Sequence, residues 1–200
     1  MSYAIVGFGA VGQALARAFA RNNIDVAVAS RRPPEALAPR ARAIGPQVVA
    51  KSLRDALEAD TIFLAIPFGE HRELAKALPS WAGKTIIDTT NSFGVLPETL
   101  DGLPSSAFIA KAFTGAKLVK GFNHLIAATL AADPVVEGGH RVVFLSSDDD
   151  EAIAPVAALA KQLGFAPVKL GKLDEGGALV HARGRTWGPL IFQDLFKKEP

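Results

Sequence analysis

Three glycines stand at a characteristic spacing directly after the first apolar segment of the chain. Gly7, Gly9 and Gly12 form the pattern G-x-G-x-x-G between a predicted strand over residues 3–7 and a predicted helix over residues 11–22. In such a turn the first glycine permits a tight bend, the second lets the backbone approach a pyrophosphate, and the third lets the helix pack against the strand. The helix start adds free N–H groups and the positive end of the helix dipole. The pattern therefore predicts a dinucleotide-binding turn.

A serine and two arginines follow the second predicted strand, where dinucleotide-binding sheets place the residue that contacts the adenosine ribose. An NAD site usually has Asp or Glu there, which hydrogen-bonds the ribose 2′-hydroxyl. This chain has Ser30-Arg31-Arg32 instead, and no carboxylate before Glu35. Ser30 can donate to a 2′-phosphate, and Arg31 can bind it with paired N–H groups while stacking on the adenine. We therefore predict that Ser30, Arg31 and Arg32 select NADP(H).

The ends of the fourth and fifth predicted strands supply further candidates. In a doubly wound sheet the ligand lies at the carboxyl ends of the strands, at the switch point between the first and the fourth. Ala65-Ile66-Pro67 ends the fourth strand and is predicted to pack on the nicotinamide and its ribose. His71 follows at a helix start, as either a cofactor contact or a surface histidine. Asp88 is a candidate cap of the fifth strand, and Asn91 a candidate ligand of the nicotinamide carboxamide.

The elements that must position these residues alternate between strand and helix, as a parallel α/β sheet requires. Strands are predicted over residues 3–7, 25–29, 47–50, 61–66, 84–88, 118–121, 141–145 and 166–170. Helices are predicted over residues 11–22, 52–59, 70–78, 105–113, 124–131 and 149–163. The predicted fold is an α/β, doubly wound, mostly parallel sheet.

No linker or internal repeat divides the chain, so residues 1–200 are expected to form one domain. Residues 1–170 hold the core sheet and helices, and the apolar, aromatic segment over residues 171–200 is predicted to close it. The connection over residues 31–46 has four prolines and is expected to be irregular or to hold a short helix. The connection over residues 91–104 shows no clear periodicity.

Composition excludes several classes of function. The net charge is only +2, without a basic stripe, so no nucleic-acid partner is expected. There is no cysteine, which excludes disulfides and thiol chemistry and fits a cytoplasmic location. No apolar run reaches the roughly 18 residues that a membrane span needs. The acidic run over residues 148–151 is interpreted as a helix start, and no metal site is predicted.

The chain resembles the NADP oxidoreductases that use the deazaflavin coenzyme F420. The likeness is carried by the glycine motif, Ser30-Arg31-Arg32, Ala65-Ile66-Pro67 with His71, Gly83-Lys84 through Asp88 with Asn91, and Val119-Lys120-Gly121-Phe122-Asn123. The resemblance implies a Rossmann-type NAD(P)-binding fold, with cofactor contacts at Phe8, Gly9, Ala10, Val11, Ser30 and Arg31. It implies coenzyme F420 as the second substrate. The chain is also similar to the reductase domains of membrane metallo-reductases, which use an ordinary flavin such as FMN or FAD.

Residue types that the chain lacks or has only once exclude two common kinds of catalytic site. Tyr3 is the sole tyrosine, so a Tyr-x-x-x-Lys acid pair is impossible, and no cysteine set can hold a catalytic zinc. A conjugated ring acceptor needs little acid–base assistance, because the cofactors carry the chemistry. Lys120, Asn123 and His124, near the end of the sixth strand, are candidates for hydrogen-bonding the acceptor.

Three functions remain open from the sequence. The first is hydride transfer between NADPH and a flavin-like or deazaflavin acceptor. The second is reduction of a small carbonyl or imine, with Lys120 or His124 as the proton donor. The third is a non-enzymatic NADP(H) sensor. The apolar carboxyl-terminal segment is expected to pack against a second copy and form a homodimer.

Overall fold

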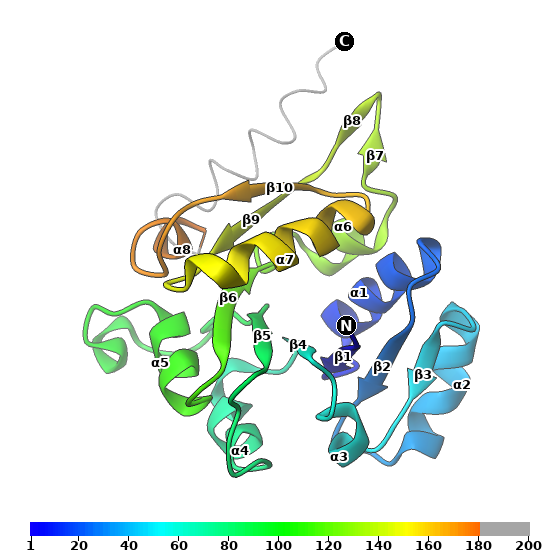
Figure 1. Cartoon of the computed structure of the whole chain (residues 1–200), viewed down its shortest axis with the longest axis horizontal. Coiled ribbons are helices and arrows are strands. Elements are labelled where there is room, and N and C mark those ends of the chain that lie inside the picture. Colours follow the sequence, from blue (N-terminus) through cyan, green and yellow to red (C-terminus); the bar gives the residue numbers. More distant parts are fainter. Residues whose placement is uncertain (181–200) are drawn as a thin grey trace.

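The computed structural model describes residues 1–180, and a twisted sheet of eight strands runs through them (Figure 1). Its strands are β1 (Tyr3–Val6), β2 (Val26–Ala29), β3 (Val48–Ala50), β4 (Thr61–Leu64), β5 (Thr85–Asp88), β6 (Lys117–Gly121), β9 (Val142–Ser146) and β10 (Ala166–Lys169). Their order is β10-β9-β6-β5-β4-β1-β2-β3. All eight predicted strands are confirmed.

Strand direction explains where a ligand site can form. Every neighbouring pair in the sheet is parallel except β6 and β9, which are antiparallel. β1 lies between β2 and β4, so the chain turns to opposite sides of β1 at this point. The carboxyl ends of β1 and β4 therefore form the predicted switch point, where connections diverge and leave room for a ligand.

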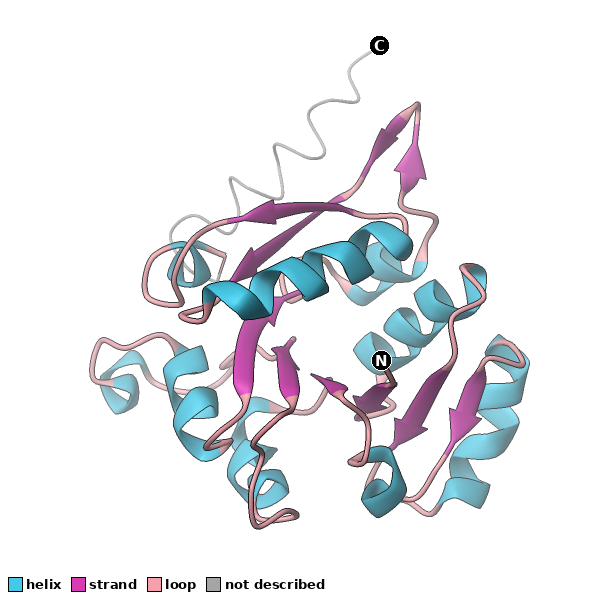
Figure 2. Cartoon of the chain, in the orientation of Figure 1, coloured by secondary structure: helices cyan, strands magenta, loops and turns pink. Residues whose placement is uncertain are grey.

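Helices cover both faces of the sheet (Figure 2). They are α1 (Ala10–Arg21), α2 (Pro34–Ile44), α3 (Leu53–Ala56), α4 (His71–Ala75), α5 (Ser105–Ala112), α6 (Ala127–Ala131), α7 (Asp150–Gln162) and α8 (Gly176–Leu179), with 3₁₀ turns η1 (Phe68–Glu70) and η2 (Pro97–Leu100). Residues of α1, α2, α6 and α7 pack in one apolar cluster, and residues of α3, α4 and α5 pack in the other. The parallel strands are apolar because both of their faces are covered.

Aromatic contacts extend through the first cluster. The centroid of the Phe63 ring lies 5.6 Å from the ring centroids of both Phe19 and Phe122. The ring centroids of Phe122 and Phe165 are 5.9 Å apart. These rings join α1, β4 and the ends of β6 and α7 across one face of the sheet. Burial of such large rings contributes much of the apolar stabilisation of a core.

The proline-rich connection over residues 31–46 contains a longer helix than its composition suggests. Pro34 occupies the first helical position of α2, where a missing N–H removes no hydrogen bond. Pro39 lies inside the helix but is exposed, while Leu37 and Ala41 are buried. The packing of this apolar face compensates for the proline, and this compensation is not visible in a local pattern.

Two other elements complete the described chain. A short hairpin of β7 (Val135–Val136) and β8 (Gly139–His140), which the sequence did not predict, precedes β9. As expected for a helix start, Asp149 caps α7 by accepting hydrogen bonds from the N–H groups of Glu151 and Ala152. In residues 171–180, Leu173 and Val180 are buried. The rest of the predicted closing segment, and the homodimer contact assigned to it, lie outside the described residues.

Candidate functional site

Each glycine of the motif has a separate structural role. Gly7 has a φ of +101°, and a Cβ there would lie 2.2 Å from the Ala65 carbonyl oxygen. A Cβ on Gly12 would lie 1.9 Å from the Gly7 carbonyl oxygen. At Gly9, by contrast, the position of a Cβ has no atom of a non-neighbouring described residue within 4 Å. The fold therefore requires Gly7 and Gly12, whereas Gly9 leaves open space.

That open space lies at the amino end of α1. Gly9 is the N-cap residue, without a side chain to cap the helix, and the first turn carries no acidic residue. Ala10, Val11 and Gly12 form that first turn, so their N–H groups have no partner within the helix. Such a helix start favours an anion at its end.

A pocket of about 700 Å³ opens beside this turn. The residues that line it come from the ends of β1, β2 and β4, from α3, and from η1 and α4 with the residues that follow α4. It brings together the predicted residues Gly7, Phe8, Gly9, Ser30, Arg31, Arg32, Ala65, Ile66 and Pro67. Residues far apart in the chain thus meet at one edge of the sheet, as the switch point predicts.

The segment after β2 is ordered by its own polar contacts. The Ser30 hydroxyl oxygen accepts a hydrogen bond of 3.0 Å from the Arg32 N–H, which leaves the hydroxyl proton available to donate. The Arg31 guanidinium contacts the Glu70 carboxylate at 2.9 Å, and the Arg31 side chain is 84% exposed. Two guanidinium groups therefore stand at the rim of the pocket.

Several lining residues were missing from the sequence prediction. Leu53, Leu74 and Ala77 add apolar surface, whereas Glu70, Glu73 and Lys76 add charge. For carboxylates near the adenosine ribose, the prediction considered only the segment after β2. Glu70 comes from the segment after β4, which neighbours β1 in the sheet, so its position six residues after that strand was the available signal.

His71 lies beside the pocket residues but faces the protein interior. Its side chain is buried rather than on the helix surface, so the surface interpretation is wrong. Its Nδ1 atom is 2.5 Å from the Phe68 carbonyl oxygen, and its ring centroid is 4.8 Å from that of Phe68. Its Nε2 atom has no hydrogen-bond partner among the described residues. Contact of His71 with a cofactor stays a prediction.

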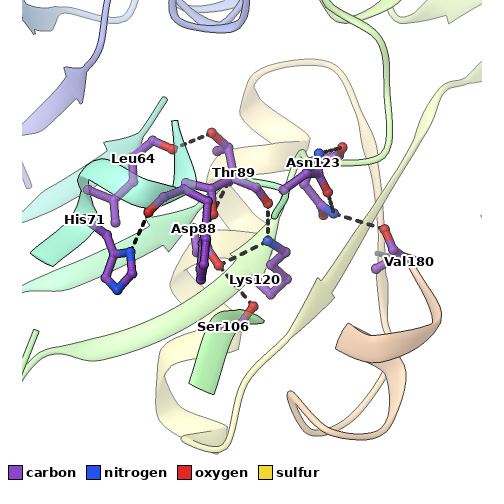
Figure 3. Close-up of polar contacts among 11 residues, drawn as sticks. Leu64, His71, Asp88, Thr89, Ser106, Lys120, Asn123 and Val180 are labelled. Atoms are coloured by element: carbon purple, nitrogen blue, oxygen red, sulfur yellow. Dashed lines mark hydrogen bonds and ion pairs between the residues drawn. The ribbon is translucent and has the colours of Figure 1, made fainter. Parts of the chain in front are cut away.

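A buried ion pair joins β5, β6 and α5 (Figure 3). One Asp88 carboxylate oxygen accepts from the Lys120 ammonium group and the Ser106 hydroxyl, both at 3.0 Å. The other accepts from the N–H and the hydroxyl of Thr90 at 2.9 and 2.7 Å. Lys120 also donates to the Thr90 carbonyl oxygen. Asp88 thus caps its strand end, as predicted.

The burial of Lys120 differs from what its charge suggests. Its side chain is 1% exposed, so the lysine is not a solvated surface charge. His124 is also buried, and its Nε2 atom lies 3.1 Å from the Val142 carbonyl oxygen. Acceptor contacts by either residue stay predictions.

Two asparagines link the ends of β5 and β6. The Asn91 amide nitrogen donates to the Asn123 carbonyl oxygen at 2.9 Å. The Asn123 amide nitrogen donates to Asn91 Oδ1 at 3.1 Å and to the Val180 carbonyl oxygen at 3.0 Å. Asn91 does not line the pocket, and its predicted carboxamide contact remains untested by this geometry.

Neither a membrane span nor a cluster of metal ligands occurs among the described residues. Within residues 1–180, no helix combines the length and apolar character that crossing a membrane requires. In the same range, no group of three or more histidine, aspartate or glutamate side chains is arranged to hold a metal ion.

Known proteins are similar to this chain in sequence and in fold. Residues 2–92 match the family model described as NADP oxidoreductase coenzyme F420-dependent. A hypothetical protein from Sinorhizobium meliloti, known from its crystal structure, is 38% identical in sequence to this chain. The match covers 93% of this chain and 92% of that protein's chain, with a TM-score of 0.88. A crystal structure from Arthrobacter sp. FB24, described as an F420-dependent NADP reductase, is 28% identical. The match covers 98% of this chain and 94% of the Arthrobacter chain, with a TM-score of 0.69.

A curated relative extends the similarity beyond these structures. Metalloreductase STEAP3 of Rattus norvegicus is 30% identical over 173 residues, which cover 84% of this chain and 33% of that protein. The chain therefore spans about one third of the length of the curated relatives that it matches. Taken with the sheet order and the glycine turn, these similarities show a Rossmann-type fold whose amino-terminal part, residues 2–92, resembles the coenzyme F420-dependent NADP oxidoreductases.

Proposed function

We propose that the pocket binds NADP(H) and that the chain transfers a hydride between NADPH and a flavin-like ring, either a deazaflavin of the F420 type or FMN or FAD. The observation that carries the proposal is the convergence of Gly9 and Ser30-Arg31-Arg32 on one pocket. Its volume, about 700 Å³, is in the range of small-molecule and cofactor pockets.

The turn at Gly9 supports binding of a diphosphate. A backbone that carries no side chain at this point lets phosphate oxygens approach the N–H groups of Ala10 and Val11. Among residues 1–180 the fold gives no reason for glycine at position 9, because a Cβ there would have no atom of a non-neighbouring residue within 4 Å. A ligand that occupies the space supplies the reason.

The other end of the pocket supports recognition of a phosphorylated adenosine. Ser30, Arg31 and Arg32 offer a hydroxyl donor and two guanidinium groups for a 2′-phosphate. Leu53, Leu74 and Ala77 provide an apolar wall suited to an adenine ring. Arginine also stacks on aromatic faces, so Arg31 can contact base and phosphate together.

The third part of the pocket suits the nicotinamide. Ala65-Ile66-Pro67 lines the wall at the end of β4, and these side chains present apolar surface that excludes water from a reacting ring. When bound, NADPH supplies the hydride, and the protein orients the two rings. Correct orientation can account for a large part of the rate enhancement.

The state of the candidate acids favours a ring acceptor over a small carbonyl or imine. Carbonyl reduction needs a proton donor within hydrogen-bond reach of the substrate. The Lys120 ammonium group contacts Asp88 and Thr90, and both Lys120 and His124 are buried. A flavin or deazaflavin spreads the arriving charge over its own ring system and requires no such donor.

Stopped-flow mixing tests the proposal. NADPH-loaded protein is mixed with a deazaflavin, with FMN and with a panel of small carbonyl compounds, while the nicotinamide absorbance is followed. We expect protein-dependent oxidation with a deazaflavin or flavin and none with the carbonyls. Turnover of a carbonyl would support the second function, and tight NADPH binding without any turnover would support the sensor.

A further inference from the structure

A carboxylate stands against the arginine that the proposed function assigns to the 2′-phosphate. The Arg31 guanidinium and the Glu70 carboxylate are 2.9 Å apart, although they come from the segments after β2 and β4. Both side chains line the pocket. We infer that Glu70 reduces the preference of this site for NADP(H) over NAD(H), by competing with the 2′-phosphate for Arg31. This inference rests on the proposed function.

The exposure of the Arg31–Glu70 ion pair determines whether a 2′-phosphate can displace Glu70 from Arg31. The Arg31 side chain is 84% exposed and that of Glu70 is 33% exposed. Exposed ion pairs are worth about 0–1 kcal/mol, so a phosphate can displace this contact. A phosphate monoester carries a charge of about −1.5 to −2 at neutral pH, and it makes stronger bidentate bonds with arginine. Glu70 therefore weakens NADP(H) binding but does not prevent it.

The neighbouring charges identify Glu70 as the carboxylate concerned. Glu73 also lines the pocket, but its carboxylate contacts Lys76 at 2.8 Å. Arg32 has no ion pair within residues 1–180 and can contribute to the phosphate without breaking a contact. Arg31 is thus the cation for which the protein and the ligand compete.

The same carboxylate does not oppose the binding of a cofactor that lacks the 2′-phosphate. NAD sites use an Asp or Glu after β2 to accept a hydrogen bond from the ribose 2′-hydroxyl. This chain has no carboxylate in that segment before Glu35, and Glu70 reaches the same corner from β4. With NADH bound, Arg31 keeps its ion pair and no like charge approaches Glu70.

Equilibrium titration of nicotinamide fluorescence tests the inference with the full chain. Dissociation constants for NADPH and NADH are measured for the wild type, Glu70→Gln and the control Glu35→Gln. We expect Glu70→Gln to lower the Kd for NADPH by about three- to tenfold, from removal of one charge near a phosphate at the surface. The Kd for NADH should stay equal or rise. Glu35→Gln removes the same charge outside the pocket lining and should change the ratio of the two constants little.

A double-mutant cycle with Arg31→Gln separates competition from general repulsion. In the Arg31→Gln background the effect of Glu70→Gln on NADPH should fall to less than about twofold, because interaction energies appear only while both partners are present. An undiminished effect in that background would overturn the competition. The competition would also be overturned if the single Glu70→Gln variant kept the wild-type ratio of its dissociation constants for NADPH and NADH, or if its Kd for NADPH increased.

A phosphate-bearing fragment distinguishes this inference from the proposed function. Binding of 2′,5′-ADP is compared with that of 5′-ADP in the same proteins, and unfolding by urea shows that each variant is folded. If the wild type binds neither NADPH nor 2′,5′-ADP, the proposed function fails. If the wild type binds both and Glu70→Gln leaves the preference unchanged, the role of Glu70 fails alone.

Discussion

At the scale of single residues, the account depends on Arg31 as a ligand of the 2′-phosphate. Arg31→Glu should weaken NADPH binding by about 10- to 100-fold, because charged hydrogen bonds are worth about 1.5–3 kcal/mol. NADH binding should change much less. Fluorescence titration measures both constants, and Arg40→Glu, an exposed residue of α2, is the control for the change of charge. Equal losses for the two cofactors would show that Arg31 does not contact the phosphate.

Gly9 gives a second test at this scale. Its φ is −79°, which a valine also adopts, and its Cβ position is open. Gly9→Val should therefore leave the fold intact and reduce binding of NADPH and NADH alike below detection, because the side chain occupies the proposed diphosphate position. Titration and circular dichroism check the two halves of the prediction. Gly12→Val is the contrasting variant and should unfold the protein, since its Cβ would lie 1.9 Å from a carbonyl oxygen. Retained NADPH binding by Gly9→Val would contradict the account.

At the scale of elements, the Lys120–Asp88 pair holds β5, β6 and α5 together. Lys120→Met should lower the free energy of unfolding by about 3–5 kcal/mol, because it leaves the buried Asp88 carboxylate without its counter-ion. Adding Asp88→Asn should restore part of this loss by removing the charge. Urea unfolding of both variants measures the effect. If Lys120→Met is as stable as the wild type, the pair does not stabilise the fold.

A pH-dependent contact joins the starts of β1 and β4. The Asp60 carboxylate accepts hydrogen bonds from the N–H and hydroxyl of Ser2, and these bonds lower the pKa of Asp60 below its usual value. A lowered folded-state pKa means that the stabilisation is complete above the unfolded pKa and is lost as pH falls through the folded pKa. The stability difference between the wild type and Asp60→Asn should therefore shrink in acid. Urea unfolding over a pH series tests this, and a constant difference would contradict it.

The elements differ in how far the sequence determines them. The strands are predictable because parallel strands are covered on both faces and are therefore short apolar runs between turn residues. The length of α2 is not predictable from its prolines, because burial of Leu37 and Ala41 overrides local preference. The antiparallel pairing of β6 with β9 leaves no local trace either, since strand direction depends on the path of the chain between them.

The candidate site shows the same division. Gly7 and Gly12 are predictable because each has a local geometric requirement, which the structure makes explicit. The role of Glu70 is not predictable from the sequence, because its ion pair with Arg31 forms only when β4 pairs with β1 in the folded sheet. The burial of Lys120 is equally non-local, since a lysine in a strand is ordinarily solvated unless a distant carboxylate meets it.

At the scale of the whole molecule, the order of strands creates the site. The turn after β1, the arginines after β2 and the apolar residues after β4 are separated in the chain and meet at one edge of the sheet. This arrangement hosts many activities, so the acceptor must be identified by kinetics rather than by fold. The homodimer is predicted to form through the carboxyl-terminal segment, and light scattering can test it by measuring the molar mass in solution.

A crystal structure of the NADPH complex tests the central claim most directly. The account predicts the 2′-phosphate against Ser30, Arg31 and Arg32, and the diphosphate over Gly9 at the start of α1. A complex in which NADPH binds elsewhere, or in which its phosphorylated ribose points away from Arg31, would contradict it.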